Sequence, residues 1–188
     1  MAIGKELGPY IVWNIKNLYR SVPDMLIIAL LLIAILGSII IFAVKRIKPK
    51  RSYVGGMLLI EYFLLLFFAT VFLRPLHEVH EYNFHFFWSY FAFYKGALNI
   101  MAINIMNIVV FVPLGVLLSI SYRGITLYRV FVLSALSSIL IEVLQFVLKR
   151  GVAEIDDVFH NTLGALLGFG LYRFFSWIWI KIVRLRTC

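Results

Sequence analysis

Charged residues are scarce in this chain. Only 14% of its 188 residues are Asp, Glu, Lys or Arg, whereas 63% are hydrophobic. Soluble domains carry about 25% charged residues, and a soluble fold of this length cannot bury so much apolar surface. The composition therefore excludes a soluble enzyme, intrinsic disorder, collagen-like repeats and coiled coils, and it predicts an integral membrane protein.

Cysteine is almost absent as well. The single thiol, Cys188, cannot form an internal disulfide, and no Cys spacing typical of a metal site occurs. The net charge is +9, but the basic residues lie beside apolar runs, which favours anchoring to anionic lipid headgroups over binding of nucleic acid. The first apolar run, Met25–Val44, is too long for a signal-peptide core and indicates an uncleaved membrane helix.

Apolar runs long enough to cross about 30 Å of hydrocarbon as helices recur along the chain. We expect an all-α, polytopic bundle of about five membrane-spanning helices. The runs are Met25–Val44, Tyr53–Leu73, Asn99–Ile120, Val130–Leu148 and Val158–Ile180. They divide the chain into an interfacial segment (1–24), two first helices (25–73), an outer loop (74–98), a three-helix core (99–180) and a basic tail (181–188).

The basic residues also suggest an orientation. The connections at 45–51 and 121–129 and the tail together hold ten basic residues and no carboxylate, whereas the opposite side holds seven basic residues and seven acids. The positive-inside rule then places the N-terminus outside and the C-terminus in the cytoplasm of a bacterial plasma membrane.

The predicted outer loop is rich in aromatic residues, with nine between Tyr82 and Tyr94. Trp and Tyr favour the headgroup level, so we expect this loop to lie along the outer surface or to dip into it. Segment 1–24 is expected to lie in the interface as an amphipathic helix. Anchoring of the chain to the membrane surface is sufficient to explain both segments, and recognition of a lipid is the alternative.

Polar residues inside the predicted helices carry the most information, because each costs free energy unless it is paired. They recur at helical spacing, so each set shares one face of its helix. The sets are Ser138, Glu142 and Gln145; Asp157, Asn161, Gly164 and Gly168; and Asn104 with Asn107. Three such faces on consecutive helices are expected to meet inside the bundle, near its outer end.

Structural roles explain several of these residues. Asp156 or Asp157 can cap the last helix, and Gly164 with Gly168 forms a helix-packing motif. Glu142 has the weakest structural explanation, and we expect it to pair with Arg150 or Arg74.

Catalysis is an alternative role for the carboxylates. Glu142 and Asp157 are the candidates for a general acid or base, although no motif of a known enzyme class is present. The acidic pair is a weak metal signal, so we expect no metal and no cofactor.

The third to fifth predicted helices resemble the VanZ-like family of small bacterial membrane proteins. The resemblance rests on N-I-V-V-F-V-P-L-G from Asn107, on Glu142-x-x-Gln145, on the block from Arg150 to Asp157, and on Asn161-Thr162-x-Gly164-x-x-x-Gly168. It covers roughly a third of the chain, and Arg74 is compatible with it.

The resemblance implies association with resistance to glycopeptide antibiotics, notably lipid-tailed ones of the teicoplanin type. We therefore expect an outward-facing polar pocket that binds the antibiotic or a lipid-linked wall precursor and has membrane lipid as a partner. The expected ligand-binding residues are Asn107, Glu142, Gln145, Arg150, Asp156, Asp157, Asn161 and Arg74. The alternatives are an intramembrane enzyme that modifies an envelope precursor and a structural partner of other envelope proteins.

Overall fold

The computed structural model describes residues 51–186 of the chain. Segment 1–24 and the predicted helix Met25–Val44 lie outside the described residues. In chain order the elements are α2 (Arg51–Val71), β1 (Glu81–Asn83), α3 (Trp88–Tyr94), α4 (Leu98–Ser121), α5 (Leu127–Val147), β2 (Val152–Glu154) and α6 (Ile155–Arg186). The helical architecture is confirmed for this part, and two short strands, which the sequence analysis did not predict, are added to it.

Four helices are long and apolar enough to cross a membrane. Their spans are Ser52–Val71, Ile100–Ser121, Leu127–Val147 and Ile155–Leu185, which match the last four predicted runs within a few residues. The largest shift is in α6, which begins at Ile155 and so takes Asp156 and Asp157 into its first turn. Negative charge is favoured there because the N-terminus of a helix carries a partial positive charge.

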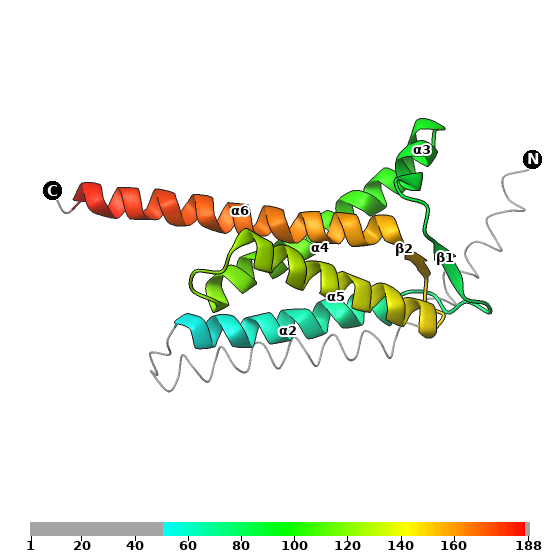
Figure 1. Ribbon diagram of the computed structural model, residues 1–188, viewed down its shortest axis with the longest axis horizontal. Helices are drawn as coiled ribbons and strands as arrows, with labels where there is room; N and C mark the ends of the chain where they lie inside the picture. The colour runs from blue at the N-terminus through cyan, green and yellow to red at the C-terminus, as the bar shows by residue number, and fades with distance from the viewer. Residues whose placement is uncertain (1–50, 187–188) are drawn as a thin grey trace, which may run out of the picture.

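The long helices lie side by side along the longest axis of the molecule (Figure 1). Helix α4 packs against α2 and α6, and α5 packs chiefly against α6. One end of the bundle carries β1, β2 and α3, and we call it the strand end (residues 72–97 and 148–157). The opposite end carries the α4–α5 turn (122–126) and the last part of α6 (176–186), and we call it the basic end.

Glycines set the close approach of α4 and α6. A Cβ added at Gly115 would overlap the carbonyl oxygen of Ala165 on α6. A Cβ at Gly164 or Gly168 would likewise overlap carbonyl oxygens of Ile108 and Val112 on α4, respectively. Small residues allow the main chains of two helices to pack closely in a membrane, where lipid tails compete with apolar side chains. The α4–α6 pair is therefore the closest helix packing described by these glycines.

Apolar side chains fill the interior and also cover much of the outside. A buried cluster includes Leu66, Phe111, Leu114, Val130 and Ile141. Many large apolar residues on the same helices are exposed, as expected where a helix faces acyl chains. The buried polar residues are therefore the unusual feature of this bundle.

The strand end is closed by two connections that pair with each other. Strand β1 runs parallel to β2, with Glu81 opposite Val152 and Asn83 opposite Glu154. The tight turn before β2 places Lys149 and Gly151 at positive φ, 54° and 80°. Glycine adopts this conformation without steric cost, and the N–H of Gly151 donates to the Pro75 carbonyl. The loop after α2 is thereby fixed over the ends of α5 and α6.

Candidate functional site

The polar residues of α5 all point into the bundle. Ser138, Glu142 and Gln145 are 0%, 7% and 1% exposed. On α6, Asp157, Asn161, Gly164 and Gly168 are also buried. On α4, Asn104 is buried, whereas Asn107 is half-buried. The helical periodicity thus identified the inward faces.

Glu142 is held by the backbone of β2. The N–H of Glu154 donates to Glu142 Oε2 at 2.9 Å. Asp157 and Arg74 lie within electrostatic range of the same carboxyl group. Glu142 therefore accepts from the chain directly before α6, and its charge environment comes from the first turn of α6 and the loop after α2.

Asp157 forms an ion pair with Arg74, one of the two arginines that the sequence analysis expected beside Glu142. Arg74 Nη2 lies 3.7 Å from Asp157 Oδ2, and the side chain of Arg74 is one-third exposed. Asn107 lies near Asp157, and Asn107 Nδ2 and Asp157 Oδ1 are both buried without a hydrogen-bond partner in the described part of the chain. These contacts bring α4, α6 and the loop after α2 together at one point.

Asp156 turns away from this point towards α3. Its Oδ1 accepts from Phe87 N at 2.6 Å, and its Oδ2 accepts from Ser89 N at 3.1 Å and from Ser89 Oγ at 2.6 Å. These N–H groups lie at the N-terminal end of α3, so Asp156 caps α3. Asp156 thus binds the start of a helix 67–69 residues earlier in the chain, while both Asp156 and Asp157 lie in the first turn of α6, the helix that one of them was expected to cap.

Arg150 and Gln145 hold α5 against the end of α2. Arg150 Nη1 donates to the carbonyl of Phe72, and its guanidinium group lies 5.5 Å from the centre of the Phe72 ring. Gln145 Nε2 donates to the carbonyl of Thr70 at 2.8 Å. Asn161 Nδ2 donates to Ser138 Oγ at 2.8 Å and links α6 to α5. These three predicted ligand residues thus make contacts within the protein.

The strand-end cluster that results consists of Arg74, Asn107, Glu142, Glu154 and Asp157. Four of these residues were predicted, and Glu154 was missed as a site residue. Its signal in the sequence was its place in the block from Arg150 to Asp157, on which the family resemblance rests. Asn161, Gln145 and Asp156 form their hydrogen bonds with residues outside this cluster, and Arg150 donates to the Phe72 carbonyl.

Glu154 links the strand-end cluster to the surface. Its burial, together with the negative charge of Asp157, raises the pKa of the Glu154 carboxyl to about 7, while the Trp88 indole and Arg74 act in the opposite direction. A cavity of about 630 Å³ opens beside it, lined by His80, Glu81, Tyr82, Asn83, His85, Trp88, Val152 and Glu154. We call this the strand-end cavity. None of the eight predicted ligand residues lines it.

Aromatic side chains surround this end. The predicted aromatic loop forms β1 and the seven-residue helix α3, with Phe84, Phe86, Phe91 and Tyr94 exposed. Tyr90 on α3 contacts buried His160 on α6, with 2.9 Å between the hydroxyl oxygen and Nε2. Asn104 Nδ2 donates to Ser89 Oγ at 3.0 Å. Helix α3 is thus fixed to both α4 and α6 by polar contacts that the sequence did not reveal.

Comparisons with known proteins agree with these features. A profile of the VanZ/LLP1 family matches residues 25–176, which is most of the chain. The chain belongs to the VanZ/LLP1 family. Protein VanZ of Enterococcus faecium is 29% identical over 125 residues, covering 62% of this chain and 75% of that protein. No solved structure matches at a significant level. The family match is confirmed, and it extends well beyond the third of the chain on which the resemblance rested: it includes every helix from α2 to α5 and most of α6.

Proposed function

We propose that this membrane protein lowers bacterial susceptibility to lipid-tailed glycopeptide antibiotics of the teicoplanin type by binding the antibiotic or an envelope lipid at its strand end. Membership of the VanZ/LLP1 family supports the association with glycopeptide resistance. The observation that carries the mechanism is the strand-end cluster, in which charged groups are held beneath a surface cavity at one end of an apolar bundle.

The orientation required by this proposal puts the strand end outside the cell. The basic end contains Arg123, Lys181, Arg184 and Arg186, with Arg129 in the adjoining first turn of α5, and no acid. The strand end, by contrast, carries Glu78, Glu81 and Glu154 besides its basic residues. The positive-inside rule therefore favours a cytoplasmic basic end. Antibiotics that act on the cell wall and lipid-linked wall precursors are then present on the side of the strand-end cavity.

The chemistry of this end suits an amphiphile. Arg74 is the partly exposed cation of the strand-end cluster and can donate to a phosphate or carboxylate. Glu154, Trp88 and His80 line the strand-end cavity and offer hydrogen-bonding groups. The exposed aromatic rings around it offer an apolar surface at headgroup level for a lipid tail. Gln145, Asn161 and Arg150 act in this account as positioning residues, because their contacts lie within the bundle.

The test is antibiotic susceptibility of a glycopeptide-sensitive bacterium that expresses the full chain. We expect the wild-type protein to raise the inhibitory concentration of teicoplanin and to leave that of a glycopeptide without a lipid tail nearly unchanged. Arg74→Gln should remove most of this gain, whereas Arg129→Gln, the same change at the basic end, should retain it at equal membrane abundance. No difference between the wild-type protein and the empty vector would contradict the proposal.

An intramembrane enzyme acting on a lipid-linked precursor is the second candidate, and one observation favours it. Glu142 and Asp157, two buried carboxylates, lie within electrostatic range of each other and can serve as acid and base. Glu142→Gln and Asp157→Asn keep polar atoms in place but remove this chemistry. Resistance that survives both changes supports binding, and resistance lost at normal abundance supports the enzyme. Resistance lost together with abundance supports the third candidate, a structural partner of other envelope proteins.

A further inference from the structure

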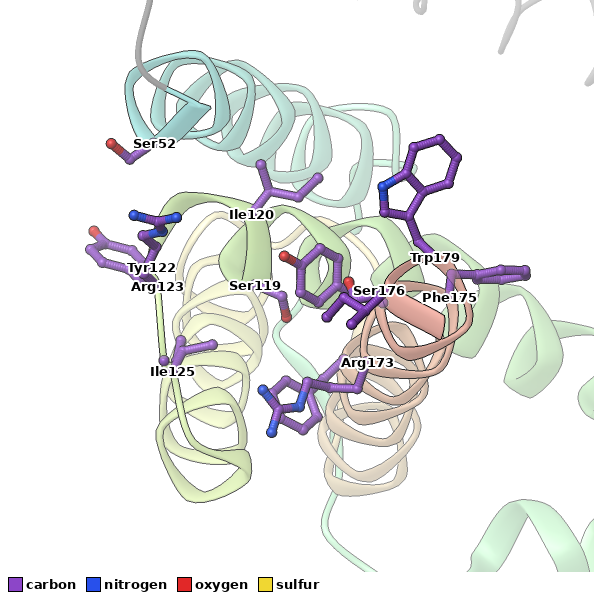
Figure 2. A pocket seen from close by; sticks show the side chains of 14 residues that line it. Ser52, Ser119, Ile120, Tyr122, Arg123, Ile125, Arg173, Phe175, Ser176 and Trp179 are labelled. Atoms are coloured by element: carbon purple, nitrogen blue, oxygen red, sulfur yellow. The ribbon is translucent and has the colours of Figure 1, made fainter. Parts of the chain in front are cut away.

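A second cavity lies at the basic end, remote from the strand-end cluster. Its volume is about 1010 Å³. Figure 2 shows Arg123 and Ile125 of the α4–α5 turn on one wall, and Arg173, Ser176 and Trp179 of α6 on the opposite wall. Ser119 and Ile120 of α4 close the space between these walls. We call this the basic-end cavity.

The lining of the basic-end cavity carries one sign of charge. Arg123 and Arg173 line it, and no carboxylate does. The ion pairs Arg74–Asp157 and His77–Glu81 both lie at the strand end and involve neither of these two arginines. The electrostatics of the basic-end cavity therefore select an anion.

The position of the basic-end cavity and its apolar walls narrow the choice of anion. Helix α4 ends at Ser121, two residues beyond cavity residue Ser119, so the cavity lies level with the end of a membrane span. Lipid phosphates lie at this level. The wall includes Phe169, Phe175 and Trp179 besides the polar groups, so an apolar chain finds contacts next to the anion. A small soluble anion has no apolar part that could contact these aromatic side chains.

Helix α6 extends the lipid-facing wall. It continues past the α4–α5 turn towards the C-terminus (Figure 1). Trp177 and Trp179 on this extension are 59% and 69% exposed, and Lys181 Nζ lies 5.2 Å from the centre of the Trp177 ring. Exposed Trp beside Lys is typical of the membrane–water interface. The basic-end cavity thus opens where phospholipid headgroups are present.

We propose that the basic-end cavity binds the phosphate headgroup of an anionic phospholipid, with Arg123 and Arg173 as phosphate-binding residues and the aromatic wall of α6 against an acyl chain. This site is separate from the proposed antibiotic or lipid site at the strand end and does not depend on it. Guanidinium groups suit phosphate because their N–H donors match its oxygens and their charge is permanent.

The test is native mass spectrometry of the full-length protein released from nanodiscs of mixed phosphatidylglycerol and phosphatidylcholine. We expect phosphatidylglycerol to be retained in preference to phosphatidylcholine. The double variant Arg123→Gln/Arg173→Gln should lower that retention about tenfold, because it removes two charge-assisted contacts. The matched control is Lys181→Gln/Arg184→Gln, which removes two charges from the same helix end but leaves the cavity lining intact. It should retain the lipid as the wild-type protein does.

A free phosphate is distinguished by a separate arm with inorganic phosphate as the probe. Displacement of retained phosphatidylglycerol by millimolar phosphate would assign the cavity to a soluble phosphate and overturn the lipid proposal. Equal retention of both lipids, or equal retention by the double variant and its control, would also overturn it. If the double variant does not fold, Ser176→Trp serves instead, since it fills the cavity without changing charge, and it should give the same loss of phosphatidylglycerol.

Discussion

Arg74 on the loop after α2 faces Asp157 in the first turn of α6, with 3.7 Å between Nη2 and Oδ2. The two residues are far apart in sequence, and the parallel pairing of β1 with β2 holds their segments at the same end of the bundle. Asn107, Glu142 and Glu154 surround this pair. A charged cluster is thereby kept inside a membrane bundle, where an unpaired charge would be costly.

Replacement of the glycines between α4 and α6 gives the clearest test of the fold. Gly168→Ala should lower the unfolding temperature strongly or prevent folding, because its Cβ would overlap the Val112 carbonyl. Gly170→Ala is the matched control, since nothing lies within 4 Å of a Cβ there. That change should be neutral or stabilise the helix by up to about 1 kcal/mol. Thermal unfolding in nanodiscs compares the two, and equal unfolding temperatures would refute the close α4–α6 contact.

Glu142 should tolerate Gln better than Leu. Gln keeps an oxygen that can accept from Glu154 N–H, so Glu142→Gln should cost little stability. Glu142→Leu leaves that half-buried N–H without its acceptor, which costs about 1–3 kcal/mol. Chemical denaturation of both variants measures the difference. Equal stability would show that the hydrogen bond from Glu154 N–H to Glu142 does not stabilise the folded protein.

The contribution of Glu154 to stability should fall as pH rises. Burial raises its pKa in the folded protein to about 7, above the usual value of 4.5, so the folded state binds the proton more tightly than the unfolded state does. This contribution is complete below pH 4.5 and is lost as pH rises through 7. Glu154→Gln should therefore gain stability relative to the wild-type protein from pH 5 to pH 8. A constant difference across that range would contradict the assignment.

Asp156 should control the order of α3. Asp156→Ala removes the acceptor of Phe87 N–H and Ser89 N–H, so amide hydrogen exchange should speed up across residues 84–95. Glu78→Ala, which removes an exposed carboxylate from the same end, should leave that exchange unchanged. Unchanged exchange in Asp156→Ala would show that α3 does not depend on this cap.

Helical periodicity in the sequence was sufficient to predict the inward faces of the bundle. Ser138, Glu142 and Gln145 are buried because residues at this spacing share one side of a helix, and an apolar environment leaves polar groups no other favourable position. The four described spans could be predicted from hydropathy, because a helix that crosses the hydrocarbon needs about 20 mostly apolar residues.

The partners of these residues could not be predicted in the same way. The pairing of Arg74 with Asp157 depends on how two loops pair as β1 and β2, and three-residue strands leave hardly any alternation in the sequence. Asp156 caps α3 through backbone N–H groups, which every residue except proline carries, so no side-chain pattern marks them. The strand-end cavity depends on the same pairing and was missed with it.

The proposed function requires that the strand end faces outside and the basic end faces the cytoplasm. Labelling of single cysteines with a membrane-impermeant maleimide tests it, in a background in which Cys188 is replaced by Ser. Lys95→Cys at the strand end and Arg123→Cys at the basic end are both exposed positions. We predict that Lys95→Cys reacts in intact cells and Arg123→Cys reacts only after permeabilisation; the opposite result would contradict the account.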